Sequence, residues 1–315
     1  MERESMRVGF GRGLVSIGHQ GDNVVVLSAD LAESTQVSLF QEAFPERYIE
    51  VGVAEQNLVT VASGLARAGK HPFTASYAAF SPGRNWEQIR TTICLNNQPV
   101  VIIGSHAGLT VGPDGATHQM LEDVALMRSL PNMTVIAPGD SLEAKRVAEF
   151  LGEYQSPAYV RLCRDKTPLF LTDMPFEHGK ARVLREGSDV ALLGTGIMTH
   201  SLLAVADELA KDGVMAEVVH VPTIKPLDEE TILRAAHKCG RVVTAEEGQI
   251  AAGFGGAVAE LLSEKLPMPI KRLGVKDRFG QSGTAAELLD EYGLTPEHML
   301  DAVKDFIQTM PKYHQ

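Results

Sequence analysis

The sequence predicts an α/β protein built from two consecutive three-layer domains, each with a mostly parallel sheet. Its 315 residues can bury two cores of ordinary domain size. Apolar runs of strand length alternate with segments of helical periodicity, which favours parallel strands joined by right-handed crossovers. The segment 171–187 contains Pro175 and Gly179 and has no helical period. It is therefore expected to link a domain of residues 1–170 to one of residues 188–315.

In the first domain, strands are expected where short apolar runs end at small or polar residues, and helices where the apolar spacing is three to four. A glycine closes the second helix and a proline stands in the first turn of the third. The expected strands are 23–28, 48–52, 71–76, 99–104, 133–137 and 157–162. The expected helices are 5–19, 53–69, one that begins at 81, 120–129 and 141–154.

The second domain shows the same alternation. The expected strands are 189–194, 216–222, 241–245 and 270–275, and the expected helices are 199–211, 228–238, 255–265 and one or two near the C-terminus. The glycines at 194 and 196 follow a strand, but the dinucleotide fingerprint needs a third glycine where Thr199 stands. Ordinary turns between strand and helix explain this cluster.

The composition argues against several kinds of binding partner. A formal net charge of −11 argues against a general nucleic-acid binder, although a few arginines could still hold a small phosphorylated substrate. The three cysteines are far apart and predict neither a disulfide framework nor a zinc site. The charged N-terminus and the absence of a long apolar run predict a cytoplasmic protein without a membrane partner.

The most informative stretch is the loop 104–118, which combines four glycines with His106, Asp114 and His118. Glycines let a backbone approach a ligand closely, and the three polar side chains can hydrogen-bond or transfer protons. A flexible connection with surface histidines is the alternative interpretation. We favour an active-site loop, because long connections in compact domains are usually functional.

Other candidates stand where strands end, at the edge where open α/β sheets bind ligands. Asp30 and Ser34 follow the first strand, although both residue types also cap turns. Glu55 begins a helix, where the helix dipole alone could explain a carboxylate. Arg164 follows the strand 157–162, as a phosphate ligand or a solvated charge.

Two aromatic residues, Tyr77 and Phe80, lie in the loop after the strand 71–76. Aromatic side chains in such loops usually fill gaps in a core. They can also stack on a heteroaromatic ring. The sequence leaves both interpretations open.

Four motifs together resemble the transketolase family. They are Leu27–Leu31, Gly52–Gln56, Ser105–Gln119 and Arg128–Asn132, and they occur in the order found in transketolases. The resemblance continues through the second domain and covers essentially the whole chain. It implies a thiamine-diphosphate-binding fold, here the pyrimidine-binding domain, followed by a fold like the transketolase C-terminal domain.

A complete transketolase also has a domain that binds the cofactor's pyrophosphate through a metal-binding Gly-Asp-Gly motif. The sequences 113–115 and 139–141 each lack one of its glycines. The resemblance therefore implies the C-terminal subunit of a split transketolase. Its partner would be an N-terminal subunit carrying the pyrophosphate site and the Mg²⁺ or Ca²⁺ ligands. The family's organisation implies a homodimer of this chain within an α2β2 complex.

The resemblance also implies residue roles in the transfer of a two-carbon ketol unit between sugar phosphates. Glu55, His106 and His118 would be catalytic. The cofactor would contact Glu55, Asp30, Phe80 and Tyr77, with Phe80 slightly favoured for stacking on the pyrimidine. Substrate would contact His106, Asp114, His118, Arg164, Ser34 and Arg7. A carboxyl group suits the position of Glu55, because it can share a proton with a weakly basic ring nitrogen in a dry site.

Departures from the pattern leave other functions open. Pro113 replaces a common acidic residue, Asn57 replaces a common histidine, and the Ala-Glu-Gln sequence at 54–56 also resembles 1-deoxyxylulose-5-phosphate synthase. The beta subunit of a 2-oxoacid dehydrogenase has a similar length, but its loop lacks the Asp-Gly-x-Thr-His sequence. A non-catalytic structural or regulatory subunit is a further alternative. The joint presence of five candidate site residues argues against it: Glu55, His106, Asp114, His118 and Arg164.

Overall fold

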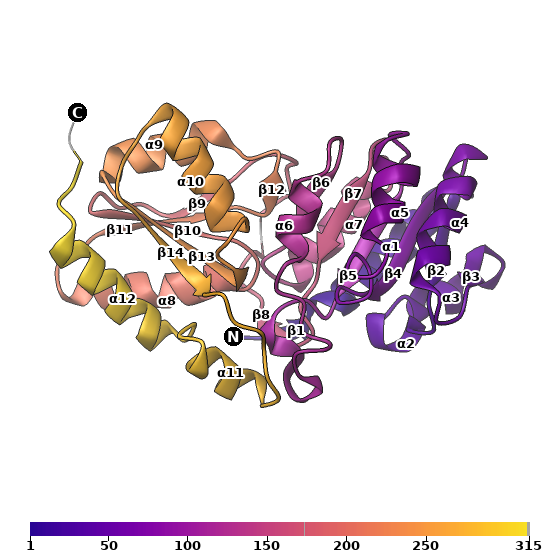
Figure 1. The fold of residues 1–315 in the computed structure, drawn as a ribbon, viewed down its shortest axis with the longest axis horizontal. Coiled ribbons are helices and arrows are strands. Elements are labelled where there is room, and N and C mark those ends of the chain that lie inside the picture. Colours follow the sequence, from indigo (N-terminus) through magenta and orange to yellow (C-terminus); the bar gives the residue numbers. More distant parts are fainter. Residues whose placement is uncertain (173, 314–315) are drawn as a thin grey trace.

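The computed structural model describes residues 1–172 and 174–313, and it confirms an α/β fold with two mostly parallel sheets (Figure 1). Within these ranges the first sheet has the strand order β12-β6-β7-β5-β4-β2-β3. Its strands are β2 (Val24–Ser28), β3 (Tyr48–Glu50), β4 (His71–Tyr77), β5 (Val101–Ser105), β6 (Thr134–Ile136), β7 (Ala158–Arg161) and β12 (Thr223–Lys225). All pair in parallel except β12, which is antiparallel to β6.

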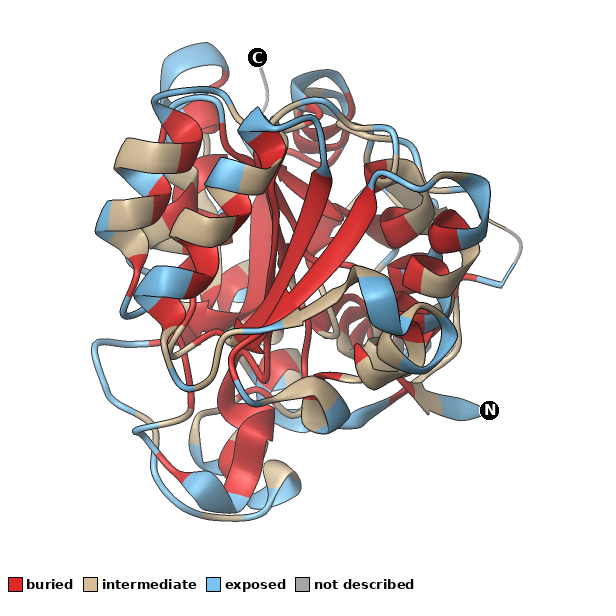
Figure 2. Ribbon diagram, turned by 90° about the vertical axis from the view of Figure 1, so that its right-hand side faces the viewer, coloured by how far each residue is buried: buried red, intermediate tan, exposed pale blue. Residues whose placement is uncertain are grey.

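Helices cover both faces of this sheet, because alternate residues of each strand point to opposite sides. Val24 and Val26 pack against the helices α1 (Met6–Gln20), α3 (Ser38–Ala43) and α7 (Ser141–Leu151). Val25 and Leu27 point to the other side, into an apolar cluster that includes residues of α4 (Glu55–Arg67), η2 (Ile89–Cys94) and α6 (Asp123–Arg128). Figure 2 shows the resulting buried strands between two layers of partly exposed helices.

The helices α1 and α7 pack closely because α1 carries glycines at the contact. A Cβ atom on Gly9 would lie 1.9 Å from the carbonyl oxygen of Ser141, and one on Gly13 would lie 2.6 Å from the Cβ of Ala148. Neither position can hold a larger residue without separating the helices. This contact fixes α1, and with it Arg7, relative to the sheet.

The second sheet has the order β14-β13-β10-β11-β9 and is parallel except for β9. Its strands are β9 (Arg182–Arg185), β10 (Val190–Gly194), β11 (Ala216–His220), β13 (Val242–Gln249) and β14 (Ile270–Val275). The accompanying helices are α8 (Met198–Lys211), α9 (Glu229–Cys239), α10 (Phe254–Lys265), α11 (Ala285–Glu291) and α12 (Pro296–Thr309). The order of elements predicted for this half is confirmed.

Three short strands lie outside the predicted pattern. β12 comes from the second half of the chain but joins the first sheet. β9 lies inside the range expected to be a linker and pairs with β11. β1 (Arg3–Ser5) pairs with β8 (Lys166–Pro168) in a separate two-stranded ribbon, which brings the start of the chain beside Arg164. The two halves are thus joined by β12, which pairs with the first sheet, as well as by their connecting segment.

The helix expected to begin at residue 81 is wrong in its start. Residues 78–85 form turns, and helical structure begins with α5 (Trp86–Gln88) and continues into the π-helical η2. Asn85 fixes the turn, because its Nδ2 donates to the carbonyl oxygen of Glu55 at 2.8 Å and to Oγ of Ser81 at 3.1 Å. The bond to Glu55, 30 positions away, overrides the local signal of Pro82.

One apolar cluster runs through both halves. It includes Val135 and Ala137 from the first half and Leu193 and Val221 from the second. Buried polar contacts add to it: Nε2 of His220 lies 2.8 Å from Oε2 of Glu143, and neither side chain reaches solvent appreciably. The halves therefore share an interior. No helix in the described part of the chain is both long and apolar enough to cross a membrane.

Candidate functional site

The functional candidates gather at the carboxyl edge of the first sheet. Tyr77 ends β4 and is paired in register with Ser105, the last residue of β5. His106 comes next, and the loop then forms the 3-10 helix η3 (Leu109–Asp114) before it reaches His118. Arg164 follows β7, the strand on the other side of β5. The parallel arrangement thus places these side chains together, as the sequence predicted.

Four of the predicted residues form a ring cluster. The rings of Tyr77 and His106 stack with their centres 3.8 Å apart, and Tyr77 and Phe80 stack at 6.0 Å. His118 presents its edge to Phe80 at 5.4 Å. Tyr77, Phe80 and His118 are each partly exposed, so the cluster offers ring faces to a ligand.

His106 is held rigidly in this cluster. It adopts a φ of +54°, its Nδ1 lies 2.9 Å from Oγ of Ser105, and only 2% of its surface is exposed. Burial, together with the charges of Arg7, Arg164 and His118, lowers the pKa of His106 from 6.5 to about 3. The imidazole is therefore neutral at neutral pH. It can accept or donate a hydrogen bond to a hydroxyl group without adding charge.

This lowered pKa predicts a specific loss of stability in acid. Below pH 6.5 the unfolded chain binds a proton at His106 that the folded chain excludes. The free energy of unfolding is therefore at its full value above this pH and decreases as the pH falls toward 3. Relative to His106→Asn, the free energy of unfolding of the wild type should fall by about 2 kcal/mol between pH 7 and pH 5. Urea unfolding across this range measures the difference. A difference that does not change with pH would contradict the neutral, buried imidazole.

Glu55 begins α4 and is 4% exposed. Its Oε2 has no hydrogen-bond partner among the described residues, and neither does Oδ1 of the adjacent Asn85. The residue lines a cavity of about 430 Å³ with Val53, Gln56, Arg84 and others. Because a buried polar atom without a partner is costly, this carboxylate is suited to a ligand that donates to it.

Arg7 and Arg164 line a second cavity, of about 580 Å³, beside η3. The guanidinium of Arg7 donates to backbone oxygens of Ser34 and of Arg164, the latter at 2.8 Å, and to Oγ of Ser5 at 3.1 Å. Nη1 of Arg164 donates to the carbonyl oxygen of Val111 at 2.6 Å. Both arginines thus brace loops, and they also place positive charge at the cavity wall.

The remaining predicted residues do not line either of these cavities. Asp30, in a left-handed conformation, and Ser34 line a third cavity of about 460 Å³ together with Glu50. The backbone nitrogen of Asp30 donates to Oε1 of Glu50 at 2.8 Å. Asp114 is exposed at the end of η3. A single chain therefore presents the predicted residues in several adjoining groups rather than in one enclosed pocket.

The sequence did not single out a buried ionic group behind the loop. Arg161 donates from Nε to Oδ2 of Asp123 at 2.9 Å, and the hydroxyl of Tyr159 donates to the same oxygen at 2.7 Å. Arg161 also donates from Nη2 to the carbonyl oxygen of Glu247, across the junction of the two halves, at 2.6 Å. The sequence signal for this group was Arg161, a charged residue inside the apolar strand 157–162.

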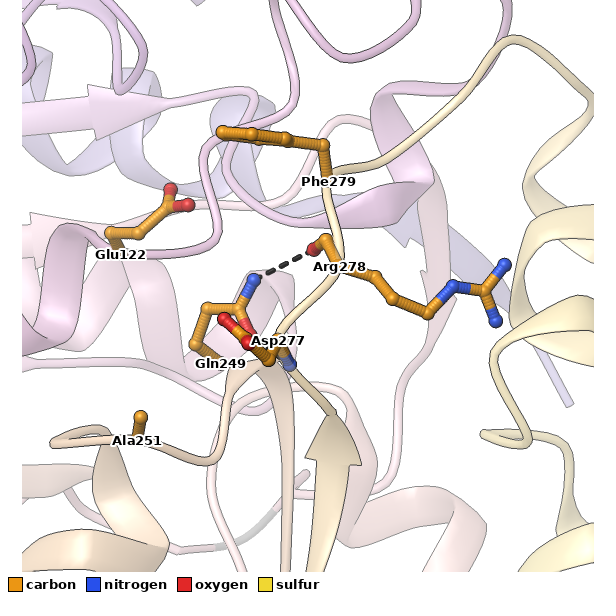
Figure 3. A pocket seen from close by; sticks show the side chains of 6 residues that line it. All are labelled: Glu122, Gln249, Ala251, Asp277, Arg278 and Phe279. Atoms are coloured by element: carbon orange, nitrogen blue, oxygen red, sulfur yellow. Dashed lines mark hydrogen bonds between the residues drawn. The ribbon is translucent and has the colours of Figure 1, made fainter.

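A smaller cavity of about 270 Å³ lies at the same junction (Figure 3). Glu122 contributes from the first half, and Phe279, 79% exposed, contributes from the second. Figure 3 shows Gln249 beneath Arg278, with its amide bonded to the Arg278 carbonyl at 2.7 Å. The polar atoms of Gln249 are therefore used to hold the segment that carries Phe279.

Comparison with known proteins gives matches along nearly the whole chain. The family model described as transketolase, pyrimidine binding domain, matches residues 3–168, and the model described as transketolase, C-terminal domain, matches residues 179–299. The "putative transketolase C-terminal section" of Methanocaldococcus jannaschii is 43% identical, with 96% of each chain covered.

Two further relatives differ in their described activities. The "6-deoxy-6-sulfo-D-fructose transketolase subunit SqwH" of Clostridium sp. is 41% identical, with 93% of this chain and 91% of the relative covered. The 1-deoxy-D-xylulose-5-phosphate synthase of a Synechococcus species is 37% identical over 95% of this chain. The chain spans 47% of that synthase.

A solved structure described as "Split gene transketolase, inactive beta4 tetramer" superimposes with a TM-score of 0.91 at 42% identity. The match covers 98% of this chain and 99% of that one. The whole fold, including the placement of the two halves, is therefore shared with that structure.

Proposed function

The chain belongs to the transketolase family, and we propose that it is the C-terminal subunit of a split transketolase that acts with a separate N-terminal subunit. The observation that carries the proposal is Glu55, a buried carboxylate with a free oxygen at the edge of a cavity. The chain spans 96% of a relative described as a transketolase C-terminal section and 47% of a 1-deoxy-D-xylulose-5-phosphate synthase.

The two family domains imply dependence on thiamine diphosphate, and the residues present fit its pyrimidine ring. Oε2 of Glu55 has no hydrogen-bond partner among the described residues, and Phe80 and Tyr77 are partly exposed aromatic rings. When bound, the cofactor supplies a nucleophilic carbon and an electron sink for cleaving a carbon–carbon bond. Glu55 would hold a proton between its free oxygen and a ring nitrogen, which selects the reactive tautomer.

The ring cluster would recognise the sugar. Neutral His106 and the partly exposed His118 can hydrogen-bond hydroxyl groups, with Asp114 at the tip of η3. The phosphate would lie against Arg164 and Arg7, whose fixed positive charges suit a dianion, with Ser34 close by. This arrangement supports reversible transfer of a two-carbon ketol unit from a ketose phosphate to an aldose phosphate.

The proposal assigns the rest of the cofactor site to other chains. We place the pyrophosphate site and its Mg²⁺ or Ca²⁺ ligands on the N-terminal subunit. A second copy of this chain would then close the separate cavities at Glu55 and Asp30, which gives an α2β2 complex. The related structure is described as a beta4 tetramer and as inactive, which agrees with a need for a second kind of subunit.

The second candidate is a 1-deoxyxylulose-5-phosphate synthase activity, favoured by the 37% identity to such enzymes. One assay separates the two. The chain and its partner subunit are mixed with xylulose 5-phosphate plus ribose 5-phosphate, or with pyruvate plus glyceraldehyde 3-phosphate. We expect ketol transfer in the first mixture and no release of carbon dioxide in the second. Release of carbon dioxide from pyruvate, without ketol transfer, would favour the synthase.

A further inference from the structure

We propose that Glu247, in the second half of the chain, is a positioning residue for the loop 106–119, hereafter the sugar loop. This inference rests on the proposed function, because that function assigns sugar recognition to the loop. Glu247 lies in β13, is 3% exposed and belongs to a different domain from every predicted site residue. The C-terminal domain would thus shape the site without touching the substrate.

The carboxylate of Glu247 lies directly against the backbone of the sugar loop. Its Oε1 accepts a hydrogen bond from the backbone nitrogen of Thr110 at 2.6 Å. A Cβ atom on Gly108 would lie 2.4 Å from Cδ of Glu247, and Gly108 has a φ of +89°. The loop therefore fits around this carboxylate only with glycine at position 108, and its contacts with Glu247 lie between His106 and Asp114 in the sequence.

Buried partners hold Glu247 in place. Arg161 donates to its backbone carbonyl oxygen, and Asp123, which also accepts from the hydroxyl of Tyr159, in turn holds the guanidinium. Burial raises the pKa of the Glu247 carboxyl group, whereas the charge of Arg161 and the bond from Thr110 oppose that rise. Arg161 thus fixes the backbone of Glu247, and burial and the bond from Thr110 hold its side chain.

The same strand also anchors the far end of the sugar loop. Gln249 accepts from the backbone nitrogen of Asp277 at 3.1 Å and donates to the carbonyl oxygen of Arg278 (Figure 3). A few residues later, the carbonyl oxygen of Gln281 accepts from Nε2 of Gln119 at 3.0 Å. That amide also reaches the carbonyl oxygen of Gly112, at 3.1 Å. β13 therefore holds the loop near both of its ends.

The neighbouring residue provides a matched control. Glu246 is 4% exposed and stands on the same strand, but it accepts bonds from the backbone nitrogens of Phe254 and Gly255 at 2.7 and 2.8 Å. It therefore holds the start of α10 and not the sugar loop. Shortening either side chain disturbs buried hydrogen bonds to backbone nitrogens, but only the change at Glu247 should affect the loop.

The experiment compares Glu247→Asp, Glu247→Gln and Glu246→Asp in the full chain. Asp keeps the charge but is one methylene too short, whereas Gln keeps both the length and an acceptor oxygen. Hydrogen exchange of the amides at 108–112 should be about tenfold faster or more in Glu247→Asp, and close to wild type in Glu247→Gln. Glu246→Asp should instead speed exchange at 254–258. Equal exchange of the sugar loop in Glu247→Asp and Glu246→Asp would overturn the proposal.

The assembled enzyme supplies a second readout. In Glu247→Asp the KM for the sugar phosphates should rise about tenfold, with the Kd for thiamine diphosphate unchanged and with recovery in Glu247→Gln. A fall in kcat alone, or a parallel loss of cofactor affinity, would contradict a positioning role. If the wild-type complex transfers no ketol unit, the proposed function fails, but hydrogen exchange still decides whether Glu247 holds the loop.

Discussion

Glu55→Gln, assembled with the partner subunit, should lose about 10³-fold or more of its turnover. The amide that replaces the carboxylate matches it in size, but it cannot share a proton with a ring nitrogen in the same way. The backbone carbonyl of Glu55 would still accept from Asn85, so the start of α4 should keep its shape. Steady-state measurement of kcat at saturating cofactor gives the effect directly.

The same substitution should not destabilise the isolated chain. Oε2 of Glu55 is buried without a partner in the isolated chain, so a neutral amide costs no more to bury and the free energy of unfolding should be equal or higher. Glu87→Gln is the control, because Glu87 is an exposed carboxylate on the neighbouring α5. Near-normal turnover in Glu55→Gln would remove this residue from the role we assign to it.

The predicted core elements agree with the structure because their signals are local. β2 and β10 are continuous apolar runs that end at small or polar residues, and both were expected within about one residue of their observed bounds. The helix α8 was likewise clear from its spacing of apolar residues. Such elements show their buried residues in the local sequence, so the local signal agrees with the fold.

The elements that the sequence did not predict depend on contacts with residues far away in the chain. β12 spans Thr223–Lys225 and exists because β6 offers an edge to pair with. The turn at 78–85 is set by Asn85 reaching Glu55, 30 positions away. No local pattern of apolar residues encodes such contacts, since their energy comes from the assembled fold.

The sequence predicted where in the fold the site residues lie, but it did not predict which atoms they contact. Tyr77, His106 and Arg164 were expected at one sheet edge because parallel strands end there, and the structure places them there. The sequence could not show that Arg7 donates to three different oxygens, or that Glu247 supports the loop from another domain. Those facts depend on side-chain directions, which only the packed structure fixes.

The proposed division of the cofactor site between two subunits should weaken cofactor binding by the isolated chain. Glu55 and the ring cluster can recognise a pyrimidine, but affinity for the whole cofactor should depend on the pyrophosphate and metal ligands that we assign to the partner. The isolated chain should therefore bind thiamine diphosphate too weakly to saturate, and it should show no turnover. Addition of the N-terminal subunit should restore both.

Calorimetric titration of the purified chain with thiamine diphosphate and Mg²⁺, with and without the N-terminal subunit, tests this account most directly. We expect no saturable heat from the chain alone and a saturable, Mg²⁺-dependent signal from the mixture. Tight, Mg²⁺-dependent binding by the chain alone would contradict the account, because it would place a complete cofactor site within this subunit.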